Sequence, residues 1–220
     1  MNSRPELRLD WCSHEAAKYA VEKWHYSGRI PSPFTKLNKI GAWEGGAFIG
    51  VLIFSTGSNK NIGAPYGLKF GSVCELVRVA LNVHRTPTSR IVAIALRLLC
   101  NEYPSIRLVV SYAATEEGHA GTLYQAGNWL FVGDVRGGDS YIVNGRKMLN
   151  RAADCSGIDK SKHERVKGHV RHKYLMPLDE AMRKQIEPLR KPYPKRVRSI
   201  ASDASTIQVE EGGATPTRTL

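Results

Sequence analysis

The sequence predicts an α/β domain with a mixed β-sheet flanked by helices. The first observation is a strand–helix–strand order in the middle of the chain. Residues 87–101 have helical apolar periodicity and lie between apolar runs at 73–83 and 106–113. Such a unit folds as a right-handed crossover between parallel strands. The second observation is a Glu-Gly-Gly turn at 44–46 between two apolar runs, which is typical of an antiparallel hairpin.

The N-terminal segment predicts a strand followed by a helix. Residues 6–12 alternate between apolar and polar side chains, as a strand does when one of its faces is exposed. Residues 13–28 fit a helix, because Ser13 can cap its first turn and Glu15 suits the positive end of the helix dipole. Gly28 is expected to end it.

The next segment predicts the hairpin and a long loop. Residues 37–43 and 47–56 are the two strands of the hairpin. The glycine-rich segment 59–71 is too polar and too interrupted for regular structure. Within it, the ring of Tyr66 could either stack on a nucleic-acid base or anchor the loop to the core.

The predicted strand at 73–83 carries charged residues among apolar ones. Arg78 is either paired in the core or directed into a cleft, where its planar guanidinium suits a carboxylate or a phosphate. Glu75 lies three positions earlier, so on a regular strand it points to the opposite face.

The turn after this strand is basic and opens the long helix. We expect Thr86 as the N-cap and Pro87 as the first helical residue. Backbone N–H groups at a helix start favour phosphate, and Arg85, Ser89 and Arg90 could add side-chain donors. The alternative is a capped helix whose arginines are simply exposed.

The following segments complete the predicted sheet. Residues 106–113 fit a buried strand that contains Ser111 near its end, and 116–127 fit a short helix. Residues 128–134 and 139–145 are expected to form a second hairpin.

Asp139 and Tyr141 share one face of the last predicted strand, because they are two positions apart. Asp139 could orient a catalytic base or bind a metal ion. It also follows two glycines, so it could equally belong to the turn.

The positive charge is concentrated toward the C-terminus. The chain has a formal net charge of +12, of which residues 146–198 carry +10 and residues 199–220 carry −2. A block of this kind favours a polyanion, nucleic acid first and an acidic membrane second. The alternative is a solvated basic surface.

We divide the chain at these composition changes. Residues 1–150 are predicted to form the catalytic domain, and residues 151–198 a basic extension that packs on or beside it. Residues 199–220 are rich in Ser, Thr, Gly and Glu and are predicted to be disordered.

Four cysteines, at positions 12, 74, 100 and 155, are not in Cys-x-x-Cys spacing, which argues against a zinc ribbon or a thioredoxin-type motif. Apolar runs are too short to cross a membrane. The sequence therefore predicts a soluble intracellular protein with free, mostly buried thiols and no membrane partner.

Several stretches together resemble a known family. The order of elements over residues 73–133 resembles the GNAT acetyltransferase fold, and "GTLYQAGNWLFVGD" (121–134) is similar to a late segment of that fold. More narrowly, six stretches in the same order resemble the Mom family of phage DNA-modification proteins, a divergent GNAT branch. They are "WHYSGRIP", "GAPYGL", "CELVRVALNVHRTPTSRIVAIALRLL", "VVSYA", "GTLYQAGNW" and "YIVNGR", within residues 20–150.

The resemblance implies an activity. The family converts adenine in duplex DNA to N6-carbamoylmethyl (acetamido) adenine, which protects phage DNA from restriction in the host cytoplasm. It also implies an acyl-CoA or related donor, with the pyrophosphate at the Arg85–Arg90 turn and Ser111 beside the acyl group. We assign Arg78, for its guanidinium, to the same cofactor site. However, this turn lacks the glycines of the usual loop, so it could instead hold another phosphate-bearing donor or a DNA phosphate.

His25 and Tyr26 stand where the first helix ends, before a glycine and two prolines. The imidazole could remove a proton from the adenine amino group during attack. Alternatively, these two side chains could bind iron with Asp139 or Tyr141, since imidazole, phenolate and carboxylate suit that metal. The family has been linked to iron, and the sequence leaves the metal unknown.

DNA adenine must leave the base stack before its N6 atom can react. We expect a pocket for the flipped base lined by His25, Tyr26, Tyr66 and Tyr141. The basic block should follow the DNA backbone, with the phosphate contacts assigned to Lys167, Arg171 and Lys173. The oligomeric state stays open, a dimer included.

Two other functions are compatible with the sequence. One is an acetyl-CoA-dependent N-acetyltransferase that acts on a protein or a small amine; the missing glycine loop and the basic block argue against it. The other is a non-catalytic DNA-binding protein on an acyltransferase scaffold.

Overall fold

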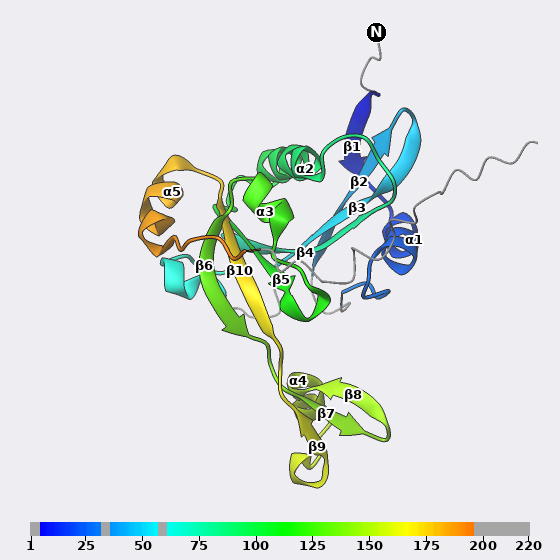
Figure 1. The fold of residues 1–220 in the computed structure, drawn as a ribbon, viewed down its shortest axis with the longest axis vertical. Coiled ribbons are helices and arrows are strands. Elements are labelled where there is room, and N and C mark those ends of the chain that lie inside the picture. Colours follow the sequence, from blue (N-terminus) through cyan, green and yellow to red (C-terminus); the bar gives the residue numbers. More distant parts are fainter. Residues whose placement is uncertain (1–4, 32–35, 57–60, 196–220) are drawn as a thin grey trace, which may run out of the picture.

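A computed structural model describes residues 5–31, 36–56 and 61–195. In these ranges the strands form a large sheet of seven strands and a small sheet of three (Figure 1). The large sheet has the order β1 (Leu7–Trp11), β2 (Leu37–Glu44), β3 (Ala47–Ser55), β4 (Val73–Leu81), β5 (Leu108–Ala114), β10 (Val170–Pro177) and β6 (Leu130–Arg136).

The predicted crossover is present at the centre of this sheet. β4 and β5 are parallel, α2 (Thr88–Glu102) connects them, and the other neighbouring pairs of the large sheet are antiparallel. The mixed α/β fold expected from the sequence is therefore confirmed. The parallel pairing spans Val73 to Glu75 against Leu108 to Val110, and both strands continue beyond it without pairing to each other.

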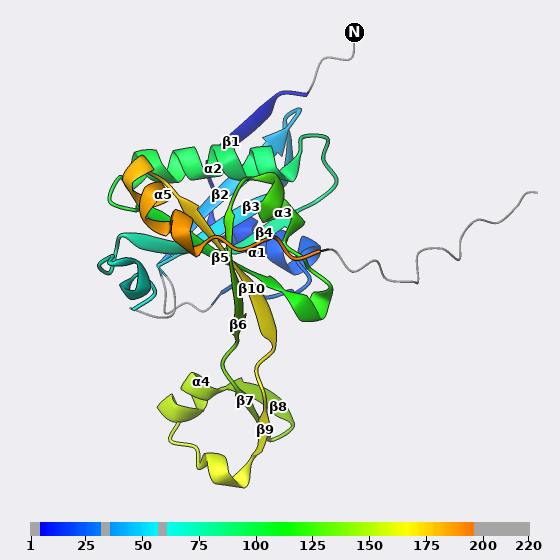
Figure 2. The ribbon, with the colours of Figure 1, turned by 60° about the vertical axis from the view of Figure 1, so that its left-hand side comes forward.

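Helices cover both faces of the large sheet, as Figures 1 and 2 show together. α2 buries an apolar stripe against alternate residues of the strands, among them Leu52 and Phe54. α1 (His14–Trp24) packs on the other face, against Val51 and Ile53. Successive strand residues point to opposite faces, so the sequence alternation itself assigns the two helices to the two sides.

The remaining helices complete these layers. The short α3 (Thr122–Ala126) lies beside α2, and α5 (Glu180–Ile186) packs on the same face as α1, where Met182 and Ile186 contact the sheet. A single turn of 3-10 helix, η1 (Ala64–Tyr66), lies beneath α5 in the same apolar cluster. None of the helices in the described ranges is long and apolar enough to cross a membrane.

The second hairpin expected from the sequence is wrong. β6 ends at Arg136 and joins the large sheet, whereas β7 (Ser140–Val143) starts a separate sheet with β8 (Arg146–Leu149) and β9 (Glu164–Val166), in the order β8-β7-β9. The two glycines between β6 and β7 turn the chain out of the large sheet instead of reversing it.

Residues 137–169 form a projection, here called the small lobe, that hangs from the ends of β6 and β10 (Figure 1). It also contains the short helices α4 (Asn150–Cys155) and η3 (Lys160–Lys162). The segments that connect the small lobe to β6 and β10 lie against each other at two glycines. A Cβ atom on Gly168 would lie 2.0 Å from the carbonyl oxygen of Gly137, so a larger residue does not fit there.

The expected division of the chain at residue 150 falls within the small lobe, at the start of α4. The stretch 151–198, expected to pack on or beside residues 1–150, supplies β10 to the interior of the large sheet. The sequence signal for β10 is weak because its first half carries Arg171 and Lys173, while its second half is buried. The tail at 199–220 lies outside the described residues.

Smaller differences concern helix ends. α1 begins where predicted, with Ser13 accepting a hydrogen bond from the N–H of Ala16, but it ends at Trp24 and not at Gly28. α2 begins at Thr88, one residue later than predicted, because the Thr86 hydroxyl bonds to another segment instead of capping the helix. The 116–127 helix is reduced to α3 and a separate 3-10 turn.

Candidate active site

A cavity of about 380 Å³ opens where β4 and β5 part. Its walls are residues 24–26 at the end of α1, 76–79 of β4, 112–114 of β5, and the segment 118–124 that leads into α3. The volume is at the small end of the range of about 300–1,000 Å³ that is usual for small-molecule sites. Parting strands leave backbone groups and side chains facing a common space, so this is the natural place for a substrate.

Ser111 connects β4 and β5 at the point where the two strands part. Its hydroxyl donates to the carbonyl oxygen of Leu76 on β4, at 2.8 Å, and lies 2.8 Å from the Tyr124 hydroxyl. Ser111 is fully buried, and Tyr124 lines the cavity. The serine thus bridges the gap where the backbone ladder has ended, with its hydroxyl bonded to a backbone carbonyl.

His25 lies in the cavity wall as a neutral imidazole. Burial, together with the positive charges of Arg78 and His119, lowers the pKa of His25 from 6.5 to about 4. The backbone N–H of Ser27 donates to Nδ1 at 3.1 Å, and the Ser27 hydroxyl is 2.8 Å from the same atom. Because a backbone N–H can only donate, Nδ1 is the acceptor and Nε2 carries the hydrogen.

Tyr26 forms the outer rim of the cavity and is 59% exposed. Its ring lies 4.3 Å from the His25 ring, at 30°, and contacts His119 edge-on at 5.3 Å. Burial of its inner edge raises the pKa of the Tyr26 phenol. An exposed aromatic face over a polar cavity is a suitable platform for a planar ring.

Arg78 reaches the same cavity from β4. Its Nε donates to the carbonyl oxygen of Arg29 at 3.2 Å, and one Nη donates to its own neighbour Val77 at 2.7 Å. These bonds tie the segment after α1 to the strand. The sequence left a core role and a cleft role open for Arg78, and its side chain lies at the cavity.

A group of charged and aromatic side chains surrounds Glu75, one residue before the cavity wall. Burial raises the pKa of the Glu75 carboxyl, whereas Arg171, Arg78 and Lys173 act to lower it. Arg171 lies over the ring of Tyr112, 5.2 Å from its centroid. No site role is predicted for Glu75 from the sequence, because a single acidic residue in an apolar strand does not form a recognisable motif.

Tyr66 belongs to the same surroundings but is buried. Its ring packs in the apolar cluster beneath α5, with Lys173 Nζ 5.1 Å from the ring centroid. Its carbonyl oxygen accepts a hydrogen bond from Gln185 at 2.8 Å. These contacts favour the reading in which Tyr66 anchors its loop.

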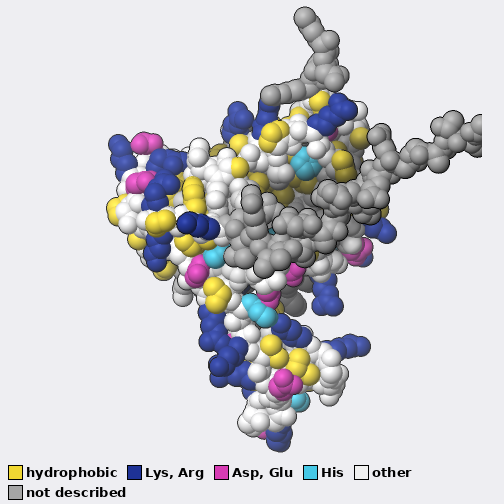
Figure 3. All heavy atoms as spheres, in the orientation of Figure 1, with side chains coloured by type: hydrophobic (Ala, Val, Ile, Leu, Met, Phe, Trp, Pro, Cys, Tyr) yellow, Lys and Arg dark blue, Asp and Glu magenta, His cyan; other side chains and the backbone are white. Residues whose placement is uncertain are grey.

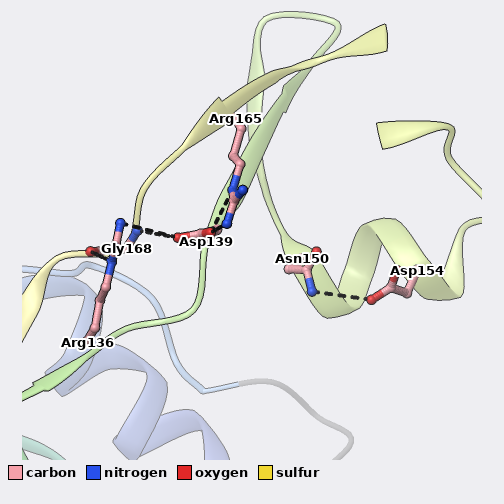
Figure 4. A network of polar contacts seen from close by, with 6 residues as sticks. All are labelled: Arg136, Asp139, Asn150, Asp154, Arg165 and Gly168. Carbon is pink, nitrogen blue, oxygen red and sulfur yellow. Dashed lines mark hydrogen bonds and ion pairs between the residues drawn. The ribbon is translucent and has the colours of Figure 1, made fainter. Parts of the chain in front are cut away.

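Asp139 and Tyr141 lie in the small lobe, in a different sheet from the cavity. Asp139 accepts hydrogen bonds from Arg165 Nε, at 2.7 Å, and from the Gly168 N–H, at 2.9 Å (Figure 4). The Gly168 and Arg165 bonds hold the pKa of Asp139 below its ordinary value. Tyr141 lies beneath Lys160, whose Nζ is 5.8 Å from the ring centroid.

The iron site considered from the sequence is therefore not assembled. His25 and Tyr26 are at the cavity, whereas Asp139 and Tyr141 are in the lobe. Within the described ranges, no three His, Cys, Asp or Glu side chains lie close enough together to hold a metal ion.

The turn before α2 carries the remaining cofactor residues predicted from the sequence. Arg85 and Arg90 are exposed, and Ser89 is half-buried. Two backbone N–H groups of this turn, those of Arg85 and Thr86, bond to the carboxylate of Glu44 at the end of β2. Glu44 was not singled out from the sequence, where it looked like part of a hairpin turn.

The small lobe carries a positive surface. Residues 137–169 contain seven Lys and Arg against four Asp and Glu. Figure 3 shows Lys and Arg side chains where the small lobe joins the large sheet and along the outside of the lobe. The exposed ones within it are Arg146, Lys147, Lys162, Arg165 and Lys167. Of the predicted phosphate contacts, Lys167 is on this surface, whereas Arg171 and Lys173 lie on β10 near Glu75.

Comparisons with known proteins place this geometry in context. Solved structures with a similar fold include a Bacillus subtilis acetyltransferase in complex with CoA, with a TM-score of 0.49 and 11% identity, covering 79% of this chain and 100% of that one. An aminoglycoside acetyltransferase in complex with coenzyme A and kanamycin has a TM-score of 0.47 and 11% identity, covering 83% and 98%.

The sequence comparisons are more specific. The methylcarbamoylase Mom of Escherichia phage Mu is 27% identical over an alignment of 205 positions, which covers 86% of this chain and 84% of that protein. The model of the Mom protein family matches residues 6–195, which include the cavity, the small lobe and β10. The chain therefore belongs to the Mom protein family.

Proposed function

We propose that this protein is a transferase that converts adenine in duplex DNA to N6-carbamoylmethyladenine. In the proposed setting it acts on phage DNA in the cytoplasm of the host and protects that DNA from restriction. Membership of the Mom family supports the activity, as does the name of the phage Mu relative, a methylcarbamoylase. The observation that carries the proposal is the cavity at the β4–β5 parting, rimmed by Tyr26 and Arg78 and adjacent to a cationic lobe.

The target adenine would enter this cavity as a flipped base. N6 lies inside the stacked duplex, so chemistry on it requires extrusion of the nucleotide. The exposed ring of Tyr26 offers a stacking face, and Tyr112 lines the wall beneath Arg171. Cations on the small lobe and β10 would hold the flanking phosphates, because phosphate contacts supply most of the affinity of proteins for DNA.

The cavity side chains would orient the two reactants. In the reaction a bond forms between N6 and the methylene carbon of the transferred group, while the bond from that carbon to the rest of the donor breaks and its electron pair leaves with the departing group. The proton lost from N6 passes to that departing group. His25, with Nδ1 occupied by Ser27, presents Nε2–H as a donor to an acceptor on the substrate. Arg78 adds a second, charged donor from β4. In this proposal the neutral imidazole of His25 binds the substrate. Asp139 and Tyr141 stabilise the small lobe, which contacts DNA.

The test is mass spectrometry of nucleosides from plasmid DNA of cells that express the chain. The wild type should yield deoxyadenosine heavier by a carbamoylmethyl group in place of hydrogen. His25→Ala should remove this product, and His14→Ala is the matched control, because His14 is an exposed histidine on the same helix. Unmodified adenine from a folded, DNA-bound wild type would contradict the proposal and favour a non-catalytic DNA-binding protein.

A further inference from the structure

The carboxylate of Glu44 is bound at the turn between β4 and α2. The N–H of Arg85 donates to Glu44 Oε2 at 2.8 Å, and the N–H of Thr86 donates to Glu44 Oε1, also at 2.8 Å. The Thr86 hydroxyl donates to the same Oε1 at 2.6 Å. These hydrogen bonds lower the pKa of Glu44, so it is a carboxylate at neutral pH.

These donors are the ones that a turn of this kind would use for phosphate. N–H groups ahead of a helix start point toward an incoming anion and are favoured by the helix dipole. Here a carboxylate, which accepts hydrogen bonds much as a phosphate does, already occupies two successive N–H groups and the adjacent hydroxyl. A pyrophosphate would have to displace this carboxylate and would also be repelled by it.

Two other residues of the turn, Pro87 and His84, also offer little to a phosphate. Pro87 has no N–H to offer. His84 spans the turn, with Nδ1 2.6 Å from the carbonyl oxygen of Asn82 and Nε2 3.1 Å from the Thr88 hydroxyl. Residues 84–88 also contain no glycine, so every position carries a side chain where close approach of a phosphate would need space.

Glu44 is held in place by the sheet. It is the last residue of β2 and pairs with Leu7 of β1. The N–H of the next residue, Gly45, donates to the carbonyl oxygen of Glu6 at 2.8 Å. On the other side, the N–H of Asn82 donates to Ile49 of β3 at 2.8 Å, so the turn and the hairpin are fixed to the same strands. The carboxylate therefore belongs to the framework of the fold.

We propose that Glu44 is a built-in substitute for the pyrophosphate of coenzyme A, so that this chain does not bind CoA through the β4–α2 turn. The residues present do not fit the cofactor that the acetyltransferase-like fold implies. Resting on the proposed function for the identity of the transferred group, the inference is that the carbamoylmethyl donor is a compact molecule without a pyrophosphate. Such a donor fits within the cavity of about 380 Å³, where Arg78 and His25 can bond to its carbonyl oxygen.

The experiment measures binding and does not need activity. Isothermal titration calorimetry compares CoA and inorganic pyrophosphate on the wild type, Glu44→Ala and Glu44→Gln. Glu6→Gln is the matched control, since Glu6 has an exposed carboxylate just before the neighbouring strand β1. The wild type and Glu6→Gln should show no saturable binding of either ligand. Glu44→Ala should bind pyrophosphate saturably, with an affinity at least about tenfold above the detection limit of the wild-type titration, because its N–H groups are freed.

Two outcomes would overturn the inference. One is saturable micromolar binding of CoA to the wild type that Glu44→Ala leaves unchanged. The other is a folded Glu44→Ala or Glu44→Gln variant, judged by circular dichroism, that gains no affinity for pyrophosphate. If instead plasmid adenine proves unmodified while these binding results hold, the proposed function fails and the role of Glu44 stands.

Discussion

The large sheet and the small lobe are stabilised in different ways. The large sheet has apolar side chains buried on both faces, for example Phe54 on the α2 face and Ile53 on the α1 face. Among the described side chains of the lobe, by contrast, the buried ones are Ser140 and Ala153. The lobe depends on polar contacts such as those of Asp139 with Arg165 and Gly168. The body of the molecule, meaning the large sheet and the helices that cover it, therefore fixes the cavity, while the small lobe keeps its charges accessible.

The largest effect should come from the body. Phe54→Ala removes a fully buried ring next to β4 and should lower the free energy of unfolding by about 3–5 kcal/mol. The half-buried Ile142 of the lobe is the counterpart, and Ile142→Ala should cost clearly less. Urea unfolding followed by far-UV circular dichroism, to which both regions contribute, measures both losses. Equal losses would show that the two regions share one core.

The second effect concerns the attachment of the lobe. Asp139→Ala removes the acceptor for Arg165 and for the Gly168 N–H, so the crossing at Gly137 and Gly168 should loosen. Hydrogen exchange should rise in residues 140–166 and stay unchanged in β4 and β5. Asp159→Ala is the control, because Asp159 bonds locally to Ser161. Faster exchange at the cavity would instead tie Asp139 to the site.

The third effect is a pH dependence that arises at the cavity. The pKa of His25 is about 4 in the folded chain and 6.5 ordinarily, so between these values the unfolded chain binds a proton that the folded chain does not. The contribution of His25 to the free energy of unfolding is therefore complete above pH 6.5 and declines as the pH falls toward 4. In thermal unfolding scans, His25→Gln should flatten this decline and His14→Gln should not.

The smallest effect should appear in DNA binding. Lys167→Ala removes one exposed cation of the lobe, so the slope of log K against log salt should fall in magnitude by about 0.9. Lys18→Ala, on α1, is the matched control and should leave the slope unchanged. Fluorescence anisotropy with a short duplex measures both slopes. An unchanged slope for Lys167→Ala would remove that residue from the DNA surface.

Much of the body could be predicted from the sequence, because its signals are local. The α2 stripe, the 44–46 turn and the Ser13 cap each depend on neighbouring residues. Arg78 lines the cavity at the β4–β5 parting, whereas Ser111 is buried beside it and bonds to Leu76 of β4. The division at residue 150, the roles given to Asp139 and Tyr141, and the donor stay predictions.

What the sequence missed depends on contacts between distant segments. β10 is weakly apolar at its start, and its position between β5 and β6 requires the chain to leave the sheet and return. Glu44 meets a turn that lies about forty residues further along the chain, and no pattern near either segment reports that contact.

The interior position of β10 also has a consequence for the order in which the protein can fold. During synthesis, β5 and β6 emerge well before the strand that joins them, and the whole lobe is made in between. Until residue 177 has left the ribosome, both strands have an unpaired edge that could associate with other chains. The sheet is therefore completed late, by a long-range strand insertion, and a chain shortened before Val170 would lack the strand that closes it.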